Sequence, residues 1–283
     1  MRFSERIGKT PSKVDIQIDS IDFELKNGIW NVISIYISEP LQRQQWLSHS
    51  HYNDLIESIW FSFFKEPIDQ IPSSTDRVIQ ELRKRFFNWN YLEVYDFIDF
   101  IASIDDPAFD SEEFIKACNF VLKRDLSGYR FVSGQLAPII NELEILEIEK
   151  AIDDSTDSNL RGVSIHLSEA LTKLSDKKNP DYRNSIKESI SAVESICQQI
   201  TGDEKAELGK AIKKLKTILP IHGALEQGFI KLYGWTSDAD GIRHAMMDES
   251  SLDQEDALYM LVSCSSFINY LITKANKLKI VIK

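Results

Sequence analysis

The sequence predicts a mainly α-helical protein of two domains, a helical N-terminal domain with a small β-hairpin and a following bundle of four to five helices. Apolar residues recur three and four positions apart through most of the chain, as on the buried face of a helix. One short segment alone has a β-prone pattern, and a polar acidic stretch, residues 151–160, separates the two helical parts. We therefore predict domains at residues 1–155 and 156–283, and 283 residues with 43% hydrophobic content suffice for two cores.

Four helices are predicted in the N-terminal domain after residue 50. They cover residues 53–66, 74–89, 89–103 and 111–125. The first must end before Pro67, because proline cannot continue a helix. Ser74 or Thr75 opens the second, since a hydroxyl at this position accepts a hydrogen bond from the free amides of the first turn.

A hairpin is predicted after the last of these helices. Two β-prone runs, Tyr129–Val132 and Gln135–Ile140, flank the dipeptide Ser133-Gly134. A two-residue connection containing glycine is typical of a tight hairpin turn. We expect the hairpin to be a small addition to a helical domain.

Five helical patterns follow in the C-terminal domain. They cover residues 160–174, 180–200, 208–218, 225–232 and 257–271. Asn179 and Pro180 mark the start of the second pattern and Gly202 its end, and Gly234 is expected to close the fourth. Because the connections are short, neighbouring helices should run antiparallel and form a bundle.

Composition excludes several classes of protein. The chain has no apolar run near 18 residues and no apolar stretch behind a basic N-terminus, so we expect a cytoplasmic protein without a membrane span. The three cysteines are widely spaced and form no metal-binding pattern. Phosphate-binding, dinucleotide-binding, zinc-protease and hydrolase motifs are missing. We expect no metal and no cofactor.

Charge differs between the two parts of the chain. The net charge is -11, with 16 basic and 28 acidic residues in 1–159 but 17 basic and 16 acidic residues in 160–283. A polyanion such as RNA is tolerated better by the nearly neutral C-terminal part. Lys210, Lys213 and Lys214 are the candidate RNA-contacting residues there, although short charge runs are usually solvated helix faces.

Several sequence blocks resemble a known family. They are MRFSERIGKTP, IDFELKNGIWNVIS, SGYRFVSGQLAPI, NSIKESISAVESICQQITG and GIRHA. These blocks resemble bacterial abortive-infection proteins that pair an AbiJ-like N-terminal domain with a C-terminal HEPN helical bundle. The resemblance implies a phage-defence protein whose HEPN-like bundle forms a homodimer and either cleaves RNA without metal or binds RNA or nucleotide. It also implies that the N-terminal domain responds to a phage or host trigger.

The resemblance points to His244 as a catalytic residue. HEPN ribonucleases place an arginine, four to six other residues and then a histidine at the start of the last bundle helix. His244 lies where that histidine is expected, but residues 237–239 are Ser, Asp and Ala, and Arg243 stands next to it instead. An imidazole can move protons near neutral pH and a guanidinium can hold phosphate oxygens. We therefore predict His244 as the general acid or base and Arg243 as the phosphate clamp.

Polar residues elsewhere are candidates to support this pair. Asp240, Asn184 or Glu188 could orient the imidazole, and Glu194 lies further along the same helical pattern as Glu188. The alternative is that Asp240 or Asp238 only caps the last helix and that both glutamates are solvated.

The family spacing is met literally in two other places. Arg43 and His49 are separated by five residues, and Arg161 and His166 by four. Residues five apart on a helix point about 140° apart, so Arg161 and His166 should not share a ligand. His166 borders an apolar stripe and is expected to be an interior histidine with a hydrogen-bond partner, whereas His49 is expected in a surface loop.

Two other functions remain open. One is a non-catalytic HEPN interaction module that binds RNA, nucleotide or a protein partner through the loop around His244. The other is an acidic regulator that neutralises a toxin. The leading hypothesis is a metal-independent endoribonuclease.

Overall fold

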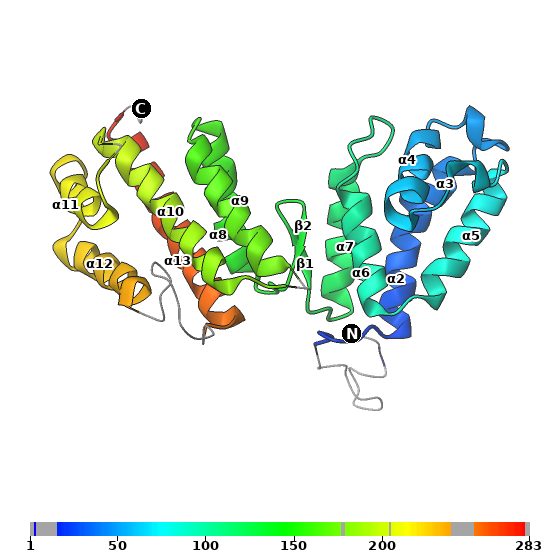
Figure 1. Ribbon diagram of the computed structural model, residues 1–283, viewed down its shortest axis with the longest axis horizontal. Helices are drawn as coiled ribbons and strands as arrows, with labels where there is room; N and C mark the ends of the chain where they lie inside the picture. Colours follow the sequence, from blue (N-terminus) through cyan, green and yellow to red (C-terminus); the bar gives the residue numbers. More distant parts are fainter. Residues whose placement is uncertain (1–2, 4–15, 177–178, 204, 239–251, 281–283) are drawn as a thin grey trace. The chain divides into compact units, whose positions relative to one another are not determined.

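A computed structural model describes Phe3 and residues 16–176, 179–203, 205–238 and 252–280. The chain forms two compact units (Figure 1). Met1–Ile140 is called unit 1 and Asn141–Lys283 is called unit 2. The described residues are mainly helical, with one small antiparallel hairpin. The predicted fold class is confirmed at this level.

Unit 1 is an assembly of short helices. Its α-helices are α2 (Phe23–Ile33), α3 (Glu39–Leu41), α4 (Asn53–Ser58), α5 (Thr75–Asn88), α6 (Tyr91–Ala102) and α7 (Ser111–Arg124). Its other helices are the π-helices η1 (Ser34–Ser38) and η3 (Ile59–Phe64) and the 3-10 helices η2 (Leu47–His49) and η4 (Ile68–Gln70). The predicted helix 53–66 is α4 continued by η3, and it ends at Lys65, which has a left-handed backbone two residues before Pro67.

Local sequence accounts for the helix starts. Ser74 is the residue before α5, as predicted, but its hydroxyl makes no capping hydrogen bond, and the Thr75 hydroxyl donates to the Gln44 carbonyl instead. Asn90 begins α6, where its side chain accepts hydrogen bonds from the amides of Leu92 and Glu93 while the Glu93 carboxylate accepts one from the Asn90 amide. This reciprocal arrangement satisfies amides that have no partner inside the helix.

Aromatic rings fill the core of unit 1. The ring centroids of Trp30 and Phe86 are 5.3 Å apart, and those of Trp89 and Phe97 are 4.9 Å apart. Helix α2 comes close to α7 at Gly28, where an added Cβ would lie 2.6 Å from a methyl group of Val121. Helix α2 is not among the helices predicted from the sequence, although it contributes much of this core.

The predicted hairpin is confirmed. Strand β1 (Arg130–Val132) pairs antiparallel with β2 (Gln135–Ala137), and Phe131 lies opposite Leu136. The turn residues Ser133 and Gly134 have φ of 46° and 83°, as a tight hairpin turn with two left-handed residues requires. Side chains from two helices fasten the strands: Asp99 accepts the Leu136 amide at 2.8 Å, and Asn119 accepts the Phe131 amide at 2.8 Å.

A buried hydroxyl pair lies beside the hairpin. The Tyr95 hydroxyl is 2.8 Å from Oγ of Ser127, and both residues are buried. Burial raises the pKa of Tyr95 from its ordinary 10.0 to about 12, although the hydrogen bond to Ser127 acts in the opposite direction. The ring therefore stays neutral in the folded protein at pH values where an exposed tyrosine ionises.

Replacing Tyr95 by phenylalanine should expose this effect. At pH 8 we expect Tyr95→Phe to lower the free energy of unfolding by about 1 kcal/mol, because one buried hydrogen bond is lost. The folded-state pKa lies above the unfolded value, so the stability that the neutral hydroxyl contributes is complete below pH 10 and is lost as pH rises toward 12. Urea unfolding between pH 8 and 12 should therefore show a steeper decline for the wild type than for the variant. Parallel curves would contradict the prediction.

Unit 2 is built on four packed helices. Helices α8 (Glu142–Asp157), α9 (Arg161–Ser175), α10 (Tyr182–Thr201) and α13 (Gln254–Lys277) pack on one another (Figure 1). Helix α11 (Leu208–Ile218) packs on α10, and α12 (Gly223–Asp238) packs on α11. The Phe229 ring of α12 also stacks on Phe267 of α13, with 3.8 Å between centroids.

The acidic stretch at residues 151–160 is largely helical. Most of it forms the end of α8, whose buried Ile148, Ala151 and Ile152 face the other helices of unit 2. Asn269 of α13 also donates a hydrogen bond to the Glu147 carbonyl at 3.0 Å. The contacts therefore divide the chain between residues 140 and 141, whereas the sequence analysis expected the boundary after residue 155.

One predicted helix start and one predicted helix end are wrong. Asn179 and Pro180 were expected to start the second helix of the C-terminal part, but α10 begins at Tyr182 and Asp181 is its N-cap. Gly234 was expected to close the fourth helix of the C-terminal part, but α12 continues to Asp238. Glycine favours a helix end when the backbone turns left-handed, as at Gly202 with φ of 65°. Gly234 has no such backbone and lies within the helix.

Candidate functional site: the seam between α9 and α10

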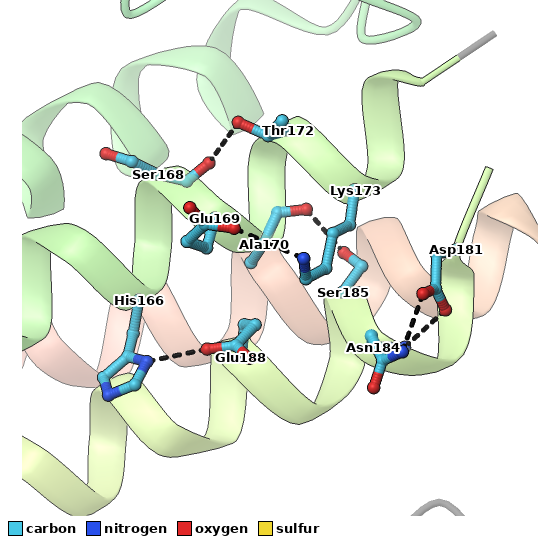
Figure 2. Close-up of polar contacts among 10 residues, drawn as sticks. All are labelled: His166, Ser168, Glu169, Ala170, Thr172, Lys173, Asp181, Asn184, Ser185 and Glu188. Atoms are coloured by element: carbon cyan, nitrogen blue, oxygen red, sulfur yellow. Dashed lines mark hydrogen bonds and ion pairs between the residues drawn. The ribbon is translucent and has the colours of Figure 1, made fainter. Parts of the chain in front are cut away.

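A histidine and a glutamate meet where α9 lies against α10. Nδ1 of His166 is 2.7 Å from Oε2 of Glu188 (Figure 2). The His166 side chain is 37% exposed and that of Glu188 is 21% exposed, so the pair is accessible at the rim of the bundle. The second ring nitrogen, Nε2, points away from Glu188 in this view.

Helical periodicity places these side chains at the rim. Helix α9 buries Val163, Leu167, Ala170, Leu171 and Leu174. Gly162, His166, Glu169 and Lys173 recur at the intervals of three and four that mark one side of a helix, next to that buried stripe. The polar rim where this side of α9 meets α10 is called the seam below.

Two buried serine hydroxyls lie beneath the seam, and one of them connects the two helices. Ser185 Oγ on α10 donates to the Ala170 carbonyl on α9 at 2.7 Å, and Ser189 Oγ donates to the Ser185 carbonyl at 2.9 Å. Both serines are completely buried. The helices are therefore held together in the core independently of the half-exposed His166–Glu188 pair.

The remaining seam residues form ordinary helix-surface contacts. Lys173 Nζ lies 3.3 Å from Glu169 Oε2, one turn away on α9. Asn184, predicted to support the site, lies one turn before Glu188, and its amide Nδ2 donates to Asp181 Oδ2 at 2.7 Å (Figure 2). Asp181 is also the N-cap of α10 and accepts the Asn184 backbone amide at 3.0 Å. Glu194 lies 3.5 Å from Gln198 Nε2, further along α10.

The three predicted RNA-contacting lysines lie on α11 and are exposed. Lys210 is 3.7 Å from Glu207 and Lys214 is 3.4 Å from Asp203, and exposed pairs of this kind contribute little to stability. Among the described residues, Lys213 has no ion pair. The lysines are therefore available to an anionic ligand, although the two existing pairs would have to open.

Three predicted site residues, His244, Arg243 and Asp240, lie outside the described residues. The structure therefore does not test the pairing of Arg243 with His244 or their approach to Glu188. It shows Glu188 in contact with a different histidine, His166.

His166 is less buried than the sequence analysis expected. It has the predicted hydrogen-bond partner, but it lies at the edge of the apolar stripe with more than a third of its side chain exposed. The sequence could not reveal the pair, because 22 positions separate the partners and only antiparallel packing brings them together. Their places at the edges of two amphipathic stripes were the sole available signal.

Other site chemistries find little support in the described part of the chain. No group of three or more histidine, cysteine or acidic side chains there is arranged to hold a metal ion. Cys118, Cys197 and Cys264 are buried, and burial raises the pKa of each thiol, which disfavours the reactive thiolate. Within the same residues, every helix is too short or too polar to cross a membrane.

The fold and the seam define a class: a two-unit helical protein whose second unit carries a polar His–Glu pair on a four-helix bundle. Comparison with known families makes the assignment more specific. AbiJ N-terminal domain 4 matches residues 1–154, and the chain belongs to this family. The match supports the predicted AbiJ-like N-terminal domain and indicates an abortive-infection, phage-defence context. No curated protein and no solved structure matches the chain.

A close approach at the end of the seam gives a test of its geometry. A Cβ added at Gly162 would lie 2.7 Å from Ser195 Oγ but 3.8 Å from Ser195 Cβ. Alanine favours a helix over glycine by up to about 1 kcal/mol, and the clash opposes this gain. We expect Gly162→Ala to stabilise the Ser195→Ala protein by roughly 0.5–1 kcal/mol and the wild type by less. Urea unfolding of the four proteins measures the difference, and equal effects in both backgrounds would show that the helices are further apart.

Proposed function

We propose that this protein is an abortive-infection effector that cleaves RNA without a metal ion. In this proposal unit 2 is a HEPN-like bundle that forms a homodimer, and the N-terminal domain responds to a phage or host trigger. The observation that carries the proposal is the AbiJ N-terminal domain at residues 1–154 on a chain that continues into a four-helix bundle. The resemblance of residues 184–202 and 238–245 to HEPN proteins supports the same function.

The charge of the chain is consistent with this division of roles. Residues 160–283 are nearly neutral, whereas residues 1–159 carry a large excess of acidic side chains. The phosphate backbone of RNA is repelled less by the C-terminal part. Lys210, Lys213 and Lys214 on the exposed face of α11 supply positive charge on a helix that packs directly on α10.

The proposed chemistry uses His244 and Arg243. His244 moves a proton between the ribose 2′-hydroxyl, the leaving 5′-oxygen and solvent, and Arg243 holds the phosphate oxygens as negative charge accumulates on them. A twofold axis through the bundle would place two such sites near each other. Asp240, Asn184, Glu188 and Glu194 are the polar residues proposed to support the site.

RNA cleavage in EDTA tests this function. We expect purified protein to cut total RNA with EDTA present, leaving 2′,3′-cyclic phosphate ends, and His244→Ala and Arg243→Ala to reduce the rate by at least about 100-fold. The matched control is His222→Ala, because Nδ1 of His222 only accepts the Ala224 amide at the start of α12. The control should retain wild-type activity.

Two results would contradict the nuclease. One is the absence of cleavage by the wild type even when it is prepared from phage-infected cells. The other is equal activity of the wild type, His244→Ala and Arg243→Ala. RNA binding without cleavage would instead identify a non-catalytic HEPN interaction module.

A further inference from the structure

An open cavity lies beside α5 in unit 1, and it is called the α5 cavity below. Its volume is about 510 Å³, which is in the range that accommodates a nucleotide-sized ligand. One wall is the face of α5 that carries Arg77, Gln80, Glu81, Lys84 and Arg85. These positions recur at intervals of three and four, as on one side of a helix. The rest of the lining comes from residues before the helix, namely Trp60, Glu66, Gln70 and Pro72.

An irregular backbone shapes the wall opposite α5. The π-helix η3 contains Trp60 and ends at Lys65, whose φ of 56° is in the left-handed region that non-glycine residues rarely adopt. The Glu66 amide then donates to the Trp60 carbonyl at 3.0 Å. Turns of π-helix are rare and are frequent at functional sites. Here the turn brings the Glu66 carboxylate onto α5.

Arg85 is held firmly at one side of the cavity. Its Nη1 and Nη2 donate to the two carboxylate oxygens of Glu66 at 2.8 and 3.0 Å, and its Nε donates to Glu81 at 2.8 Å. The guanidinium also lies 4.3 Å from the centroid of the Phe64 ring. Both carboxylates that line the cavity are therefore engaged by Arg85.

Two other cations of the lining have no such partner. Arg77 and Lys84 are exposed, and in the part of the chain that the structure describes neither has an ion pair. Acidic residues outnumber basic ones by 28 to 16 in residues 1–159, so unpaired cations on one helix face are unexpected there. Three basic and two acidic side chains line the cavity, which leaves it with a positive formal charge inside an acidic domain.

The spacing of the two cations indicates the kind of anion. Arg77 and Lys84 are seven positions apart, or roughly 10 Å along the helix axis. One phosphate cannot easily contact both side chains, whereas a chain of two or three phosphates can. A long polyanion such as RNA would extend beyond the cavity and be repelled by the acidic surroundings.

We propose that the α5 cavity binds a small ligand with two or more phosphate groups, a nucleotide or a short polyphosphate. Arg77 and Lys84 contact the phosphate oxygens, and the exposed amides of Gln70 and Gln80 donate further hydrogen bonds. This site lies in unit 1 and is additional to the proposed nuclease chemistry of unit 2.

Calorimetric titration of the full-length protein tests the site. The probes are ATP, tripolyphosphate and adenosine, each in buffer without inorganic phosphate. We expect ATP and tripolyphosphate to bind and adenosine not to bind, because the cations recognise phosphate. Tighter binding of ATP than of tripolyphosphate would identify a nucleotide site, and equal binding would identify a polyphosphate site.

Variants assign the binding to the α5 cavity. Arg77→Ala and Lys84→Ala should each weaken ATP binding by about 10-fold, because each removes a charge-assisted hydrogen bond. Gln80→Glu should also weaken it by adding a carboxylate to the same helix face. The matched control is Lys116→Ala, which removes one positive charge from exposed α7 outside the cavity and should keep wild-type affinity. All four variants should keep the wild-type Tm within a few degrees, since these side chains are exposed.

Four results would overturn the inference. They are no binding of ATP or tripolyphosphate by the wild type, adenosine binding as tight as that of ATP, unchanged affinity in Arg77→Ala and Lys84→Ala, and an equal loss of affinity in Lys116→Ala. Weaker binding accompanied by a lowered Tm in all three cavity variants would also count against it. RNA cleavage enters none of these measurements, so failure of the α5 site and failure of the nuclease are distinguishable.

Discussion

The antiparallel packing of α9 on α10 is the constraint on which unit 2 depends. Apolar residues at helical spacing on both helices bury one face of each, and α10 also packs on α11 and α13. The hydrophobic effect determines which face of each helix is buried but not how closely α9 and α10 approach each other. Individual residues at the contact determine that distance. Gly162 allows the helices to approach beside Ser195, and the buried Ser185 hydroxyl adds a directional bond to the Ala170 carbonyl. Together they fix the register that brings His166 opposite Glu188.

Unit 1 is held together by different interactions. Its helices are short, so large aromatic side chains rather than long apolar stripes supply much of the buried area. Polar side chains then connect elements distant in sequence: Asp99 and Asn119 fasten the hairpin, and Tyr95 contacts Ser127. These bonds are buried or partly buried, so removing one of them costs more stability than removing an exposed hydrogen bond. The β-hairpin is therefore an integral part of the helical core, which the sequence analysis did not anticipate.

Local features were predictable from sequence and long-range ones were not. Ser74 and Ser133-Gly134 act on neighbouring residues, so the start of α5 and the hairpin turn followed from them. The local signal at Asn179-Pro180 was misleading, because Asp181 supplies the capping side chain of α10. Helix α8 was missed because its last turns are rich in Asp, Ser and Thr, which are poor helix formers; burial of Ile148 and Ile152 overrides that preference. The His166–Glu188 pair was missed for a different reason. It depends on the register between two helices, and the pattern of one helix does not contain that information.

The chemistry of the seam follows from its partial burial. A histidine in the core would be satisfied but inaccessible, and one on the outer surface would be accessible but unoriented. At the rim between two packed helices, α10 supplies the orienting carboxylate while solvent reaches the other ring nitrogen. The rim of a helical bundle is therefore a place where an ordinary amphipathic pattern can produce an oriented and reachable proton acceptor.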